Sequence, residues 1–366
     1  MMKIIQIVPG SLQYGVGKLS IKLSEELIAK GHSVKLFNVC GVPYESKNKY
    51  ENKPYIKVYT SVISDPFYVP PPRLFLELHR ERADIIHVHN VHTLLPALVV
   101  LQLRGTSSGL ILQPHYHKYG QGIVRNVSFT IFKKIILSKI LRSFDIVVAN
   151  SKHESELLKE DFPDISHKII LVPEEYSVDR FRSIEWNPTV PKRILYVGAL
   201  RSYKNLDVLM GAFKVLVSKA RKDVRLIIIG DGPEREKLRR LAQKLGIFEY
   251  TVWKRNLSDI QLIQEYAKAS VLVSLSTLES FSRVVYEAMA IGTPLVVYNH
   301  GVYKELVSKG LAKGVSRLDV VEVANVISEA LNGHFHVRAQ WLNSLNFKNI
   351  SYADLIFKVY QKVLPR

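Results

Sequence analysis

The stretch SLSTLESFSRVVYEAMAIGTPLVV, Ser274–Val297, decides the fold of this 366-residue chain. It begins in an apolar strand pattern, passes through a short loop into a helical pattern, and ends in a second apolar strand. We expect the helix to begin at residues 280–282 and to end before Gly292, because glycine commonly closes helices. Apolar strands on both sides of a helix predict a parallel sheet that helices cover on both faces.

Two acids flank this helix pattern. Glu279 and Glu287 are eight residues apart, and eight helical residues rise about 12 Å, comparable to the separation of sugar and ribose in a sugar nucleotide. The N-terminal amides of a helix carry partial positive charge, so a diphosphate is well placed between the acids. The pattern fits a ligand made of a sugar, a diphosphate and a ribose. The alternative is an exposed acid before a helix and an unrelated acid within it.

Two upstream turns support a phosphate site. YVGALRSYKNLDVLM places Gly198 after an apolar strand and before two cations, Arg201 and Lys204. Arginine binds two phosphate oxygens at once and lysine supplies a point charge, so the pair suits a departing nucleoside diphosphate without a metal. IIIGDGPEREKLRRLA is a further strand, glycine turn and helix expected at the same sheet edge.

Strand and helix patterns alternate along almost the whole chain, with one interruption. The strand patterns are KIIQIV, SVKLFNV, DIIHVH, GLILQP, DIVVA and KIILV, followed by RILYVG, VRLIIIG, YTVWK, VLVSL and PLVVY. Residues 173–193 hold three prolines and little periodicity, which predicts a linker. We therefore expect an α/β fold of two Rossmann-like domains with parallel sheets facing each other across a cleft, residues 1–180 and 181–345.

The first glycine loop, PGSLQYGVGKLS at Pro9–Ser20, does not decide a function. A P-loop would need glycine where Leu12 stands and a hydroxyl where Leu19 stands. A dinucleotide fingerprint would need an acid at the end of the next strand, and SVKLFNVCG has none. Two interpretations remain open: an anion site at a helix N-terminus, or glycines that only make a tight turn.

Composition narrows the partners and the compartment. The single cysteine, Cys40, is typical of a reducing compartment, and no apolar run reaches the roughly 18 residues of a transmembrane helix. We expect a cytoplasmic protein. The formal net charge of +18 concentrates at residues 118–144, whose apolar side chains recur at near-helical spacing. This segment is either a surface helix packed on the core or a helix in peripheral contact with the inner, anionic face of a membrane.

VGALRSYKN, IIIGDGP and LESFSRVVYEAMAIGTPLVV together resemble the donor domain of the retaining glycosyltransferases of family 4, the E-x7-E group 1 enzymes with the GT-B fold. ADIIHVHN, GLILQPHYHKYG and the glycine loop followed by LSEELIAKGHSVKLF resemble their N-terminal domain. The resemblance implies an acceptor-binding domain 1–180, a nucleotide-sugar donor domain 181–345, and a final segment, 346–366, that packs back on the first domain.

The resemblance also implies residue roles. Arg201 and Lys204 would neutralise the leaving diphosphate, Glu279 would bind hydroxyls of the transferred sugar, and Glu287 would bind the ribose. Backbone amides toward the sugar and phosphates would come from Ser280, Phe281 and Ser282.

In the first domain, His115 would lie near the reacting sugar, and His117 is the weaker candidate for that role. Gly15 and Gly17 would contact the donor phosphates or the acceptor, and Gly198 would contact the donor. The implied reaction transfers a hexose from a UDP- or GDP-sugar to a hydroxyl of a glycan or lipid-linked acceptor, with retention and without metal or other cofactor.

Some positions depart from the family pattern or admit other interpretations. Tyr14 and Ser282 stand where the family often has glycine, and Glu174-Glu175 replace a common Asn-Gly. A metal site at the histidines of HVHNVH is disfavoured because they lack a carboxylate or thiol companion. The competing functions are a sugar-nucleotide epimerase of the same fold and a basic nucleic-acid-binding protein, although no base-readout motif is present.

Overall fold

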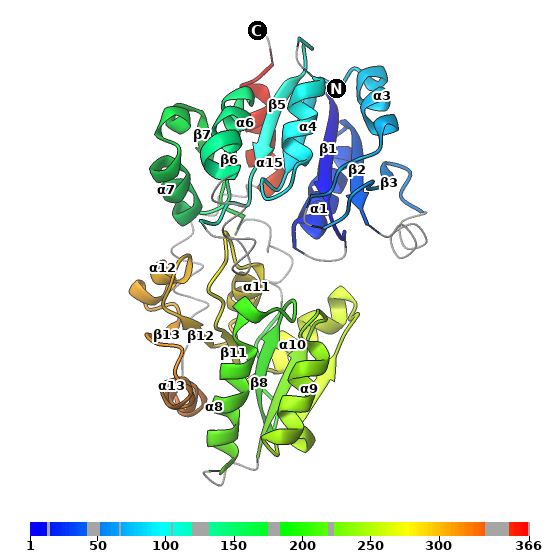
Figure 1. Ribbon diagram of the computed structural model, residues 1–366. Helices are drawn as coiled ribbons and strands as arrows, with labels where there is room; N and C mark the ends of the chain where they lie inside the picture. The colour runs from blue at the N-terminus through cyan, green and yellow to red at the C-terminus, as the bar shows by residue number, and fades with distance from the viewer. Residues whose placement is uncertain are drawn as a thin grey trace. The chain divides into compact units, whose positions relative to one another are not determined.

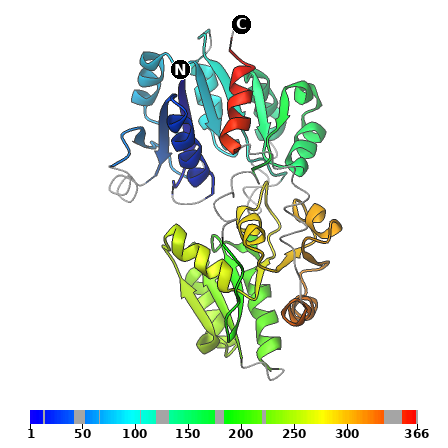
Figure 2. The same cartoon turned by 180° about the vertical axis from the view of Figure 1, so that it is seen from behind.

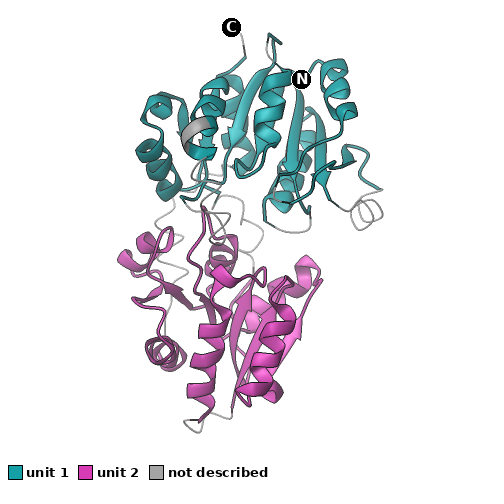
Figure 3. Cartoon of the chain, in the orientation of Figure 1, with its two compact units in different colours: residues 1–177, 350–366 teal, residues 178–349 magenta. Residues whose placement is uncertain are grey.

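The chain forms two compact units in the computed structural model (Figure 3). Unit 1 comprises Met1–Ser177 with Ile350–Arg366, and unit 2 comprises Val178–Asn349. The structure describes residues 1–12, 15–41, 52–65, 67–103, 105–118, 132–174, 184–218, 223–333 and 351–364. Tyr14 and residues 119–131, which include Tyr119 and nearly half of the stretch 118–144, therefore lie outside the described residues.

Unit 1 is built on a seven-stranded sheet whose paired strands are all parallel, in the order β3-β2-β1-β4-β5-β6-β7 (Figure 1). The order reverses direction at β1, as in doubly wound folds. The strands are β1 (Lys3–Pro9), β2 (Ser33–Cys40), β3 (Ile56–Thr60), β4 (Ile85–His89), β5 (Gly109–Gln113), β6 (Ile146–Ala149) and β7 (Ile169–Leu171).

Two helices distant in sequence lie side by side on one face of this sheet, α1 (Gly15–Ala29) and α15 (Tyr352–Gln361) (Figure 2). The leucines of α1 that recur every four residues are buried in the same apolar cluster as Tyr352, Ile356 and Tyr360 of α15. A reciprocal capping box between Ser351 and Asp354 begins α15. The expected return of the final helix to the first domain is confirmed.

The opposite face of the unit 1 sheet packs in a second cluster with four helices. These are α3 (Pro72–Glu81), α4 (Leu95–Gln102), α6 (Ser138–Ser143) and α7 (Lys152–Asp161). Because helices cover both faces, every residue of β4, β5 and β6 is buried, including the polar His87, His89 and Gln113.

Unit 2 repeats this architecture with a six-stranded parallel sheet in the order β10-β9-β8-β11-β12-β13. The strands are β8 (Lys192–Val197), β9 (Val224–Ile229), β10 (Thr251–Lys254), β11 (Val271–Ser274), β12 (Leu295–Tyr298) and β13 (Lys313–Val315). One face packs with α8 (Leu206–Ser218), α9 (Arg235–Lys244) and α13 (Val320–Asn332). The other packs with α10 (Asp259–Lys268), α11 (Arg283–Ile291) and α12 (Tyr303–Ser308).

The described part of the basic segment packs on unit 1. A π-helical turn, η1 (Lys133–Leu137), leads into α6, and Leu137, Ile140 and Leu141 are buried in the core. Lys133 and Arg142 pair with the carboxylates of Asp161 and Asp164. Among the described helices, none is long and apolar enough to cross a membrane.

Candidate active site

The predicted residues of unit 2 gather at the carboxyl ends of its central strands. Gly198, Arg201 and Lys204 follow β8, and residues 279–282 follow β11, the strand that pairs directly with β8. Glu287 lies in α11, the next helix. The carboxyl edge of a parallel sheet is where α/β proteins bind ligands, so the sequence-derived candidates share the expected edge.

Two glycine turns pack backbone against backbone at this edge. The turn after β8 donates the Gly198 amide to the Ile229 carbonyl, and the Leu200 amide to the Asp231 carbonyl. A side chain on Gly230 would place its Cβ 1.9 Å from the Gly198 carbonyl oxygen. Glycine is therefore required there by the packing itself, before any ligand is considered.

The β8 loop is also tied to the β11 loop. After a 3₁₀ turn, η4 (Ser202–Lys204), Asn205 takes a left-handed conformation, with φ 52°, and its side chain donates to the Leu275 carbonyl at 2.8 Å. The Thr277 amide donates to the Tyr203 carbonyl at 3.0 Å. These bonds fix the backbone that carries Lys204 beside the backbone that carries Glu279.

Lys204 and Glu279 form an ion pair between these two loops, and their side chains are 15% and 16% exposed. Burial alone would lower the pKa of Lys204, but the charge of the Glu279 carboxylate raises it above its ordinary value. The ammonium also lies 5.2 Å from the centre of the Tyr203 ring. The result is a permanently charged cation held at the ligand edge of the sheet.

The helix between the two acids starts later than the acid spacing alone suggests. α11 begins at Arg283 with Ser282 as its N-cap and ends before Gly292, which has φ 101°. Glu279 therefore lies in the loop, and the 1.5 Å rise per residue does not apply between it and the helix. Phe281 stacks on Tyr286, with ring centres 4.4 Å apart, which fixes the turn into the helix.

Glu287 is nearly buried in α11 and held by two side chains. Tyr266 of α10 donates its hydroxyl to Oε2 at 2.9 Å, and Arg283 lies one turn earlier, 3.4 Å from Oε1. Sequence reasoning missed both partners. The i,i+4 spacing of Arg283 and Glu287 is a sequence signal that could have revealed Arg283 as a partner. No such signal marks Tyr266, because it lies on a separate helix, α10.

Gly15 and Gly17 begin α1 in unit 1. A Cβ on Gly17 would lie 2.4 Å from the Ser11 carbonyl oxygen, so this glycine lets α1 approach the preceding loop. Gly15 has φ 45° and open space around it. Close packing therefore explains why residue 17 is glycine without any ligand. At residue 15 only the positive φ favours glycine.

His115 follows β5 in a left-handed conformation, φ 49°, which is uncommon outside glycine. Asn150 donates to its Nδ1 at 3.0 Å, so the ring proton belongs on Nε2, and Nε2 is buried without a hydrogen-bond partner among the described residues. The buried carboxyl of Glu154 accepts from the amides of Tyr116 and Asn150, bracing this loop. Burial lowers the pKa of His115 to about 3, so the ring is neutral near pH 7.

Two other histidines of unit 1, His87 and His89 of β4, are fully buried in the core. His87 Nδ1 bonds the Tyr360 hydroxyl of α15 at 2.9 Å, and His89 Nε2 bonds the Gln6 amide oxygen at 3.1 Å. His92 and His117 stack, with ring centres 3.7 Å apart. Within the described ranges, no group of three or more His, Cys, Asp or Glu residues could hold a metal ion.

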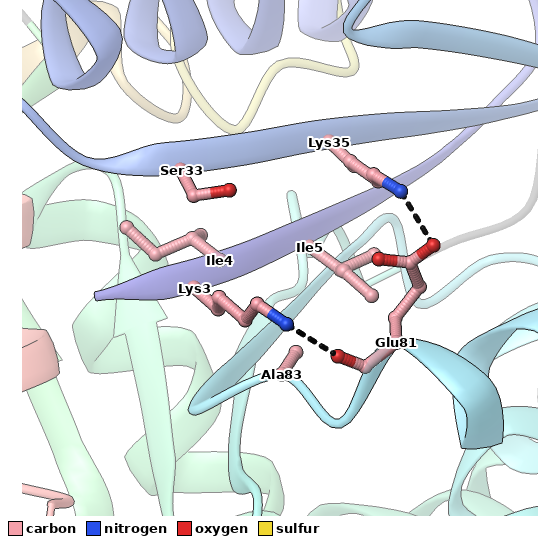
Figure 4. A pocket seen from close by; sticks show the side chains of 7 residues that line it. All are labelled: Lys3, Ile4, Ile5, Ser33, Lys35, Glu81 and Ala83. Carbon is pink, nitrogen blue, oxygen red and sulfur yellow. Dashed lines mark hydrogen bonds and ion pairs between the residues drawn. The ribbon is translucent and has the colours of Figure 1, made fainter. Parts of the chain in front are cut away.

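A small cavity in unit 1 lies away from the ligand edge. Figure 4 shows it lined by Lys3, Ile4, Ile5, Ser33, Lys35, Glu81 and Ala83. Lys3 and Ser33 are the first residues of β1 and β2, so it opens at the amino ends of these strands. Its volume, about 10 Å³, has room for one water molecule at most. It is not a ligand site.

Comparison with known protein families identifies the family to which this chain belongs. The family described as glycosyl transferases group 1 matches residues 178–334, and the one described as glycosyltransferase family 4 matches residues 14–175. The chain belongs to the group 1 glycosyltransferases of family 4. The first match falls in unit 2 and the second in unit 1.

Individual relatives of this glycosyltransferase agree with the assignment. N-acetyl-alpha-D-glucosaminyl L-malate synthase of Bacillus anthracis is 26% identical over 81% of this chain and 78% of its own length. Alpha-monoglucosyldiacylglycerol synthase of Streptococcus pneumoniae is 23% identical over 87% and 75%. The structure of Anabaena HepE in complex with UDP and glucose matches with a TM-score of 0.74 at 16% identity, over 98% of this chain and 100% of that one. The glycosyltransferase therefore has the GT-B fold.

Proposed function

We propose that this glycosyltransferase moves a hexose from a UDP- or GDP-sugar to a hydroxyl of a glycan or lipid-linked acceptor, with retention of the anomeric configuration. The observation that carries the proposal is the Lys204–Glu279 pair at the carboxyl ends of β8 and β11. The pair holds a cation for the leaving diphosphate beside an acid for the sugar hydroxyls, on two loops that hydrogen bonds tie together.

The donor extends along unit 2 in this proposal. Arg201 and Lys204 bind the diphosphate, the backbone at residues 280–282 donates amides to the sugar and phosphates, and Glu287 accepts from the ribose hydroxyls. Gly198 allows the loop to approach the phosphates closely. The two cations stabilise the charge that develops on the leaving diphosphate, so the reaction needs no metal.

Unit 1 supplies the acceptor side of the reaction. The bond from the anomeric carbon to the diphosphate oxygen breaks, the acceptor oxygen bonds the same face of that carbon, and the acceptor proton passes to the leaving diphosphate. His115 offers its Nε2–H, which has no hydrogen-bond partner in the part of the chain that the structure describes, to a sugar oxygen. Gly15 and Gly17 allow donor phosphate or acceptor to approach the α1 end.

Relatives support the ligand classes without fixing them. The Anabaena structure holds UDP and glucose, the pneumococcal relative is named for a glucosylated diacylglycerol, and the Bacillus relative for a malate glycoside. We therefore assign a nucleotide-sugar donor, and extend the acceptor proposal to lipid-linked sugars presented at the cytoplasmic face of an anionic membrane. Binding to phosphatidylglycerol vesicles, lost at high salt, tests that extension.

A donor panel tests the proposed reaction. UDP-, GDP- and ADP-hexoses are incubated singly with the protein, and release of nucleoside diphosphate is followed over hours, with and without EDTA. We expect slow hydrolysis of one UDP- or GDP-sugar that EDTA does not abolish. Hydrolysis that stops with EDTA contradicts the metal-free mechanism, and hydrolysis of none contradicts the donor class.

A further inference from the structure

A buried series of hydrogen bonds connects α15, the final helix of unit 1, to His115. Gln113, the last residue of β5, donates the hydrogens of its Nε2 to Asn150 Oδ1 and to the Tyr352 hydroxyl, which lies at 2.8 Å. Asn150, which follows β6, donates its Nδ2 to His115 Nδ1 at 3.0 Å. Gln113 and Asn150 are fully buried and Tyr352 is 3% exposed, so bulk water does not compete for these bonds.

The backbone of Asn150 is fixed on both sides. Its amide donates to the buried Glu154 carboxyl at 2.7 Å, and its carbonyl accepts from the Glu174 amide at 3.0 Å. These bonds do not determine which end of the side-chain amide faces His115. Because the oxygen and nitrogen of an asparagine amide have nearly the same shape, the hydrogen-bond partners decide between the two orientations.

The surroundings of Gln113 favour the orientation that is observed. Two N–H groups cannot bond each other, so Asn150 can turn only if Gln113 turns with it. At present the Gln113 Oε1 is buried without a hydrogen-bond partner among the described residues. Turning the amide would bury two N–H groups in its place, and a buried N–H without a partner is rarer in proteins than such a carbonyl. Gln113 therefore keeps the Asn150 nitrogen toward His115.

We infer that Gln113 is a positioning residue that fixes the Asn150 amide, so that His115 carries its ring proton on Nε2, the nitrogen assigned to the reacting sugar. The inference rests on the proposed function, since it concerns the residue placed beside that sugar. In the other tautomer Nε2 would present a lone pair to the sugar oxygen and could not donate to it. Tyr352 makes α15 part of this arrangement, because its hydroxyl accepts the second N–H of Gln113.

The tautomer of His115 in the free wild-type protein is the first test. Protein labelled with ¹⁵N-histidine gives a long-range ¹H–¹⁵N correlation spectrum that separates protonated from unprotonated ring nitrogens, and His115→Gln identifies the signals of His115. We expect the proton on Nε2. A proton on Nδ1 would mean that Asn150 faces the ring with its oxygen, and this result overturns the inference without requiring any positioning variant to fold.

A double-mutant cycle separates positioning from general damage. Gln113→Met keeps the length of the side chain but replaces the donor by a thioether sulfur, a weak acceptor. We expect both tautomers of His115 to be present in this variant, and donor hydrolysis to fall about fivefold, the effect of one neutral hydrogen bond. In an Asn150→Ala background no amide remains to be oriented, so Gln113→Met should change hydrolysis by less than about twofold.

Gln6 of β1 provides a matched control in the same sheet. It is also fully buried, its Nε2 donates to Ser24 Oγ at 2.7 Å, and its Oε1 lies 3.1 Å from His89 Nε2. Gln6→Met should leave the His115 tautomer unchanged and hydrolysis within about twofold.

Two results with the Gln113→Met variant overturn the inference: the Nε2–H tautomer alone, or an equal fall of hydrolysis in both backgrounds. Both results leave the proposed function standing. A wild-type protein that hydrolyses no donor contradicts the proposed function, whereas the tautomer spectra need no substrate and still decide whether Gln113 orients Asn150.

Discussion

Lys204 and Glu279, 75 residues apart in the chain, form an ion pair that joins the loop after β8 to the loop after β11. The pair has an energetic consequence for ligand binding. A diphosphate that binds the Lys204 ammonium competes for it with the Glu279 carboxylate. A sugar hydroxyl that binds Glu279 competes with Lys204 for the same carboxylate oxygens.

Glu279→Gln should therefore have opposite effects on binding and turnover. Gln keeps the shape but removes the charge that competes for Lys204, so we expect UDP or GDP to bind about threefold more tightly, while donor hydrolysis falls at least about tenfold. Calorimetry and nucleotide release measure the two effects. Glu305→Gln, which removes the acid of an exposed pair with Lys309, is the control. Parallel loss of binding and turnover would contradict the assigned role.

Glu287 should confer selectivity for ribose over deoxyribose. A site built to bind a hydroxyl rejects the analogue that lacks it, so wild-type protein should prefer UDP or GDP over its 2′-deoxy form by about tenfold or more. In Glu287→Gln this preference should fall below about threefold, because a neutral amide accepts more weakly than a carboxylate. Competition binding with the paired nucleotides gives both ratios. An unchanged ratio would remove Glu287 from the ribose site.

Asn150 should set the tautomer of His115. Asn150→Asp replaces a donor by an acceptor facing Nδ1, which moves the ring proton to Nδ1 and leaves Nε2 unable to donate. We expect turnover to fall about tenfold or more while the Kd for UDP or GDP stays within about twofold, because the nucleotide site is assigned to unit 2. Asn150→Ser, which keeps a donor, should restore part of the rate. A loss confined to nucleotide binding would contradict this assignment.

Unit 1 should lose stability in mild acid. His87 and His89 are fully buried, and burial lowers their pKa values, that of His87 to about 3. Because the folded pKa lies below the unfolded one, this stability is present above about pH 6.5 and is lost as the pH falls toward the folded pKa. Between pH 7 and 5.5 each histidine should cost about 1 kcal/mol.

Hydrogen exchange in peptides of β4 and β5 measures this loss locally. All three tryptophans, Trp186, Trp253 and Trp341, belong to unit 2, so their fluorescence serves as the internal comparison. His87→Gln should flatten the pH dependence of exchange in unit 1. If the protection factors in β4, which are the intrinsic exchange rates at each pH divided by the observed rates, are the same at both pH values in the wild-type protein, burial does not lower the pKa values of these histidines.

Sequence patterns predicted the helices and strands whose apolar residues recur at a regular spacing or form a continuous run. The leucine repeat placed α1, and the apolar runs placed eleven strands of the two sheets. The patterns missed β3 and β13. β3 is a short, half-exposed edge strand, and β13 is a three-residue edge strand with a glycine at its centre, so neither has a continuous apolar run.

The residues of the candidate site also fall into two groups, those that a sequence pattern marks and those that only tertiary packing brings to the site. Arg201, Lys204, Glu279 and Glu287 could be found because glycine turns and a fixed spacing mark them. Tyr266 and Tyr303 could not, because each reaches the site from a neighbouring helix through tertiary packing. The start of α11 was predicted only as a range, residues 280–282, because both Ser280 and Ser282 are good N-cap residues; the structure has Ser282 as the N-cap.

Calorimetric titration of the wild-type protein and Lys204→Ala with UDP and GDP measures whether Lys204 binds the donor diphosphate. We expect one of the two nucleotides to bind wild-type protein without added metal. We expect Lys204→Ala to weaken this binding about 100-fold or more, since a buried cation that meets a diphosphate contributes at least about 3 kcal/mol. Equal affinity of the two proteins, or no affinity of wild-type protein for either nucleotide, would contradict these expectations.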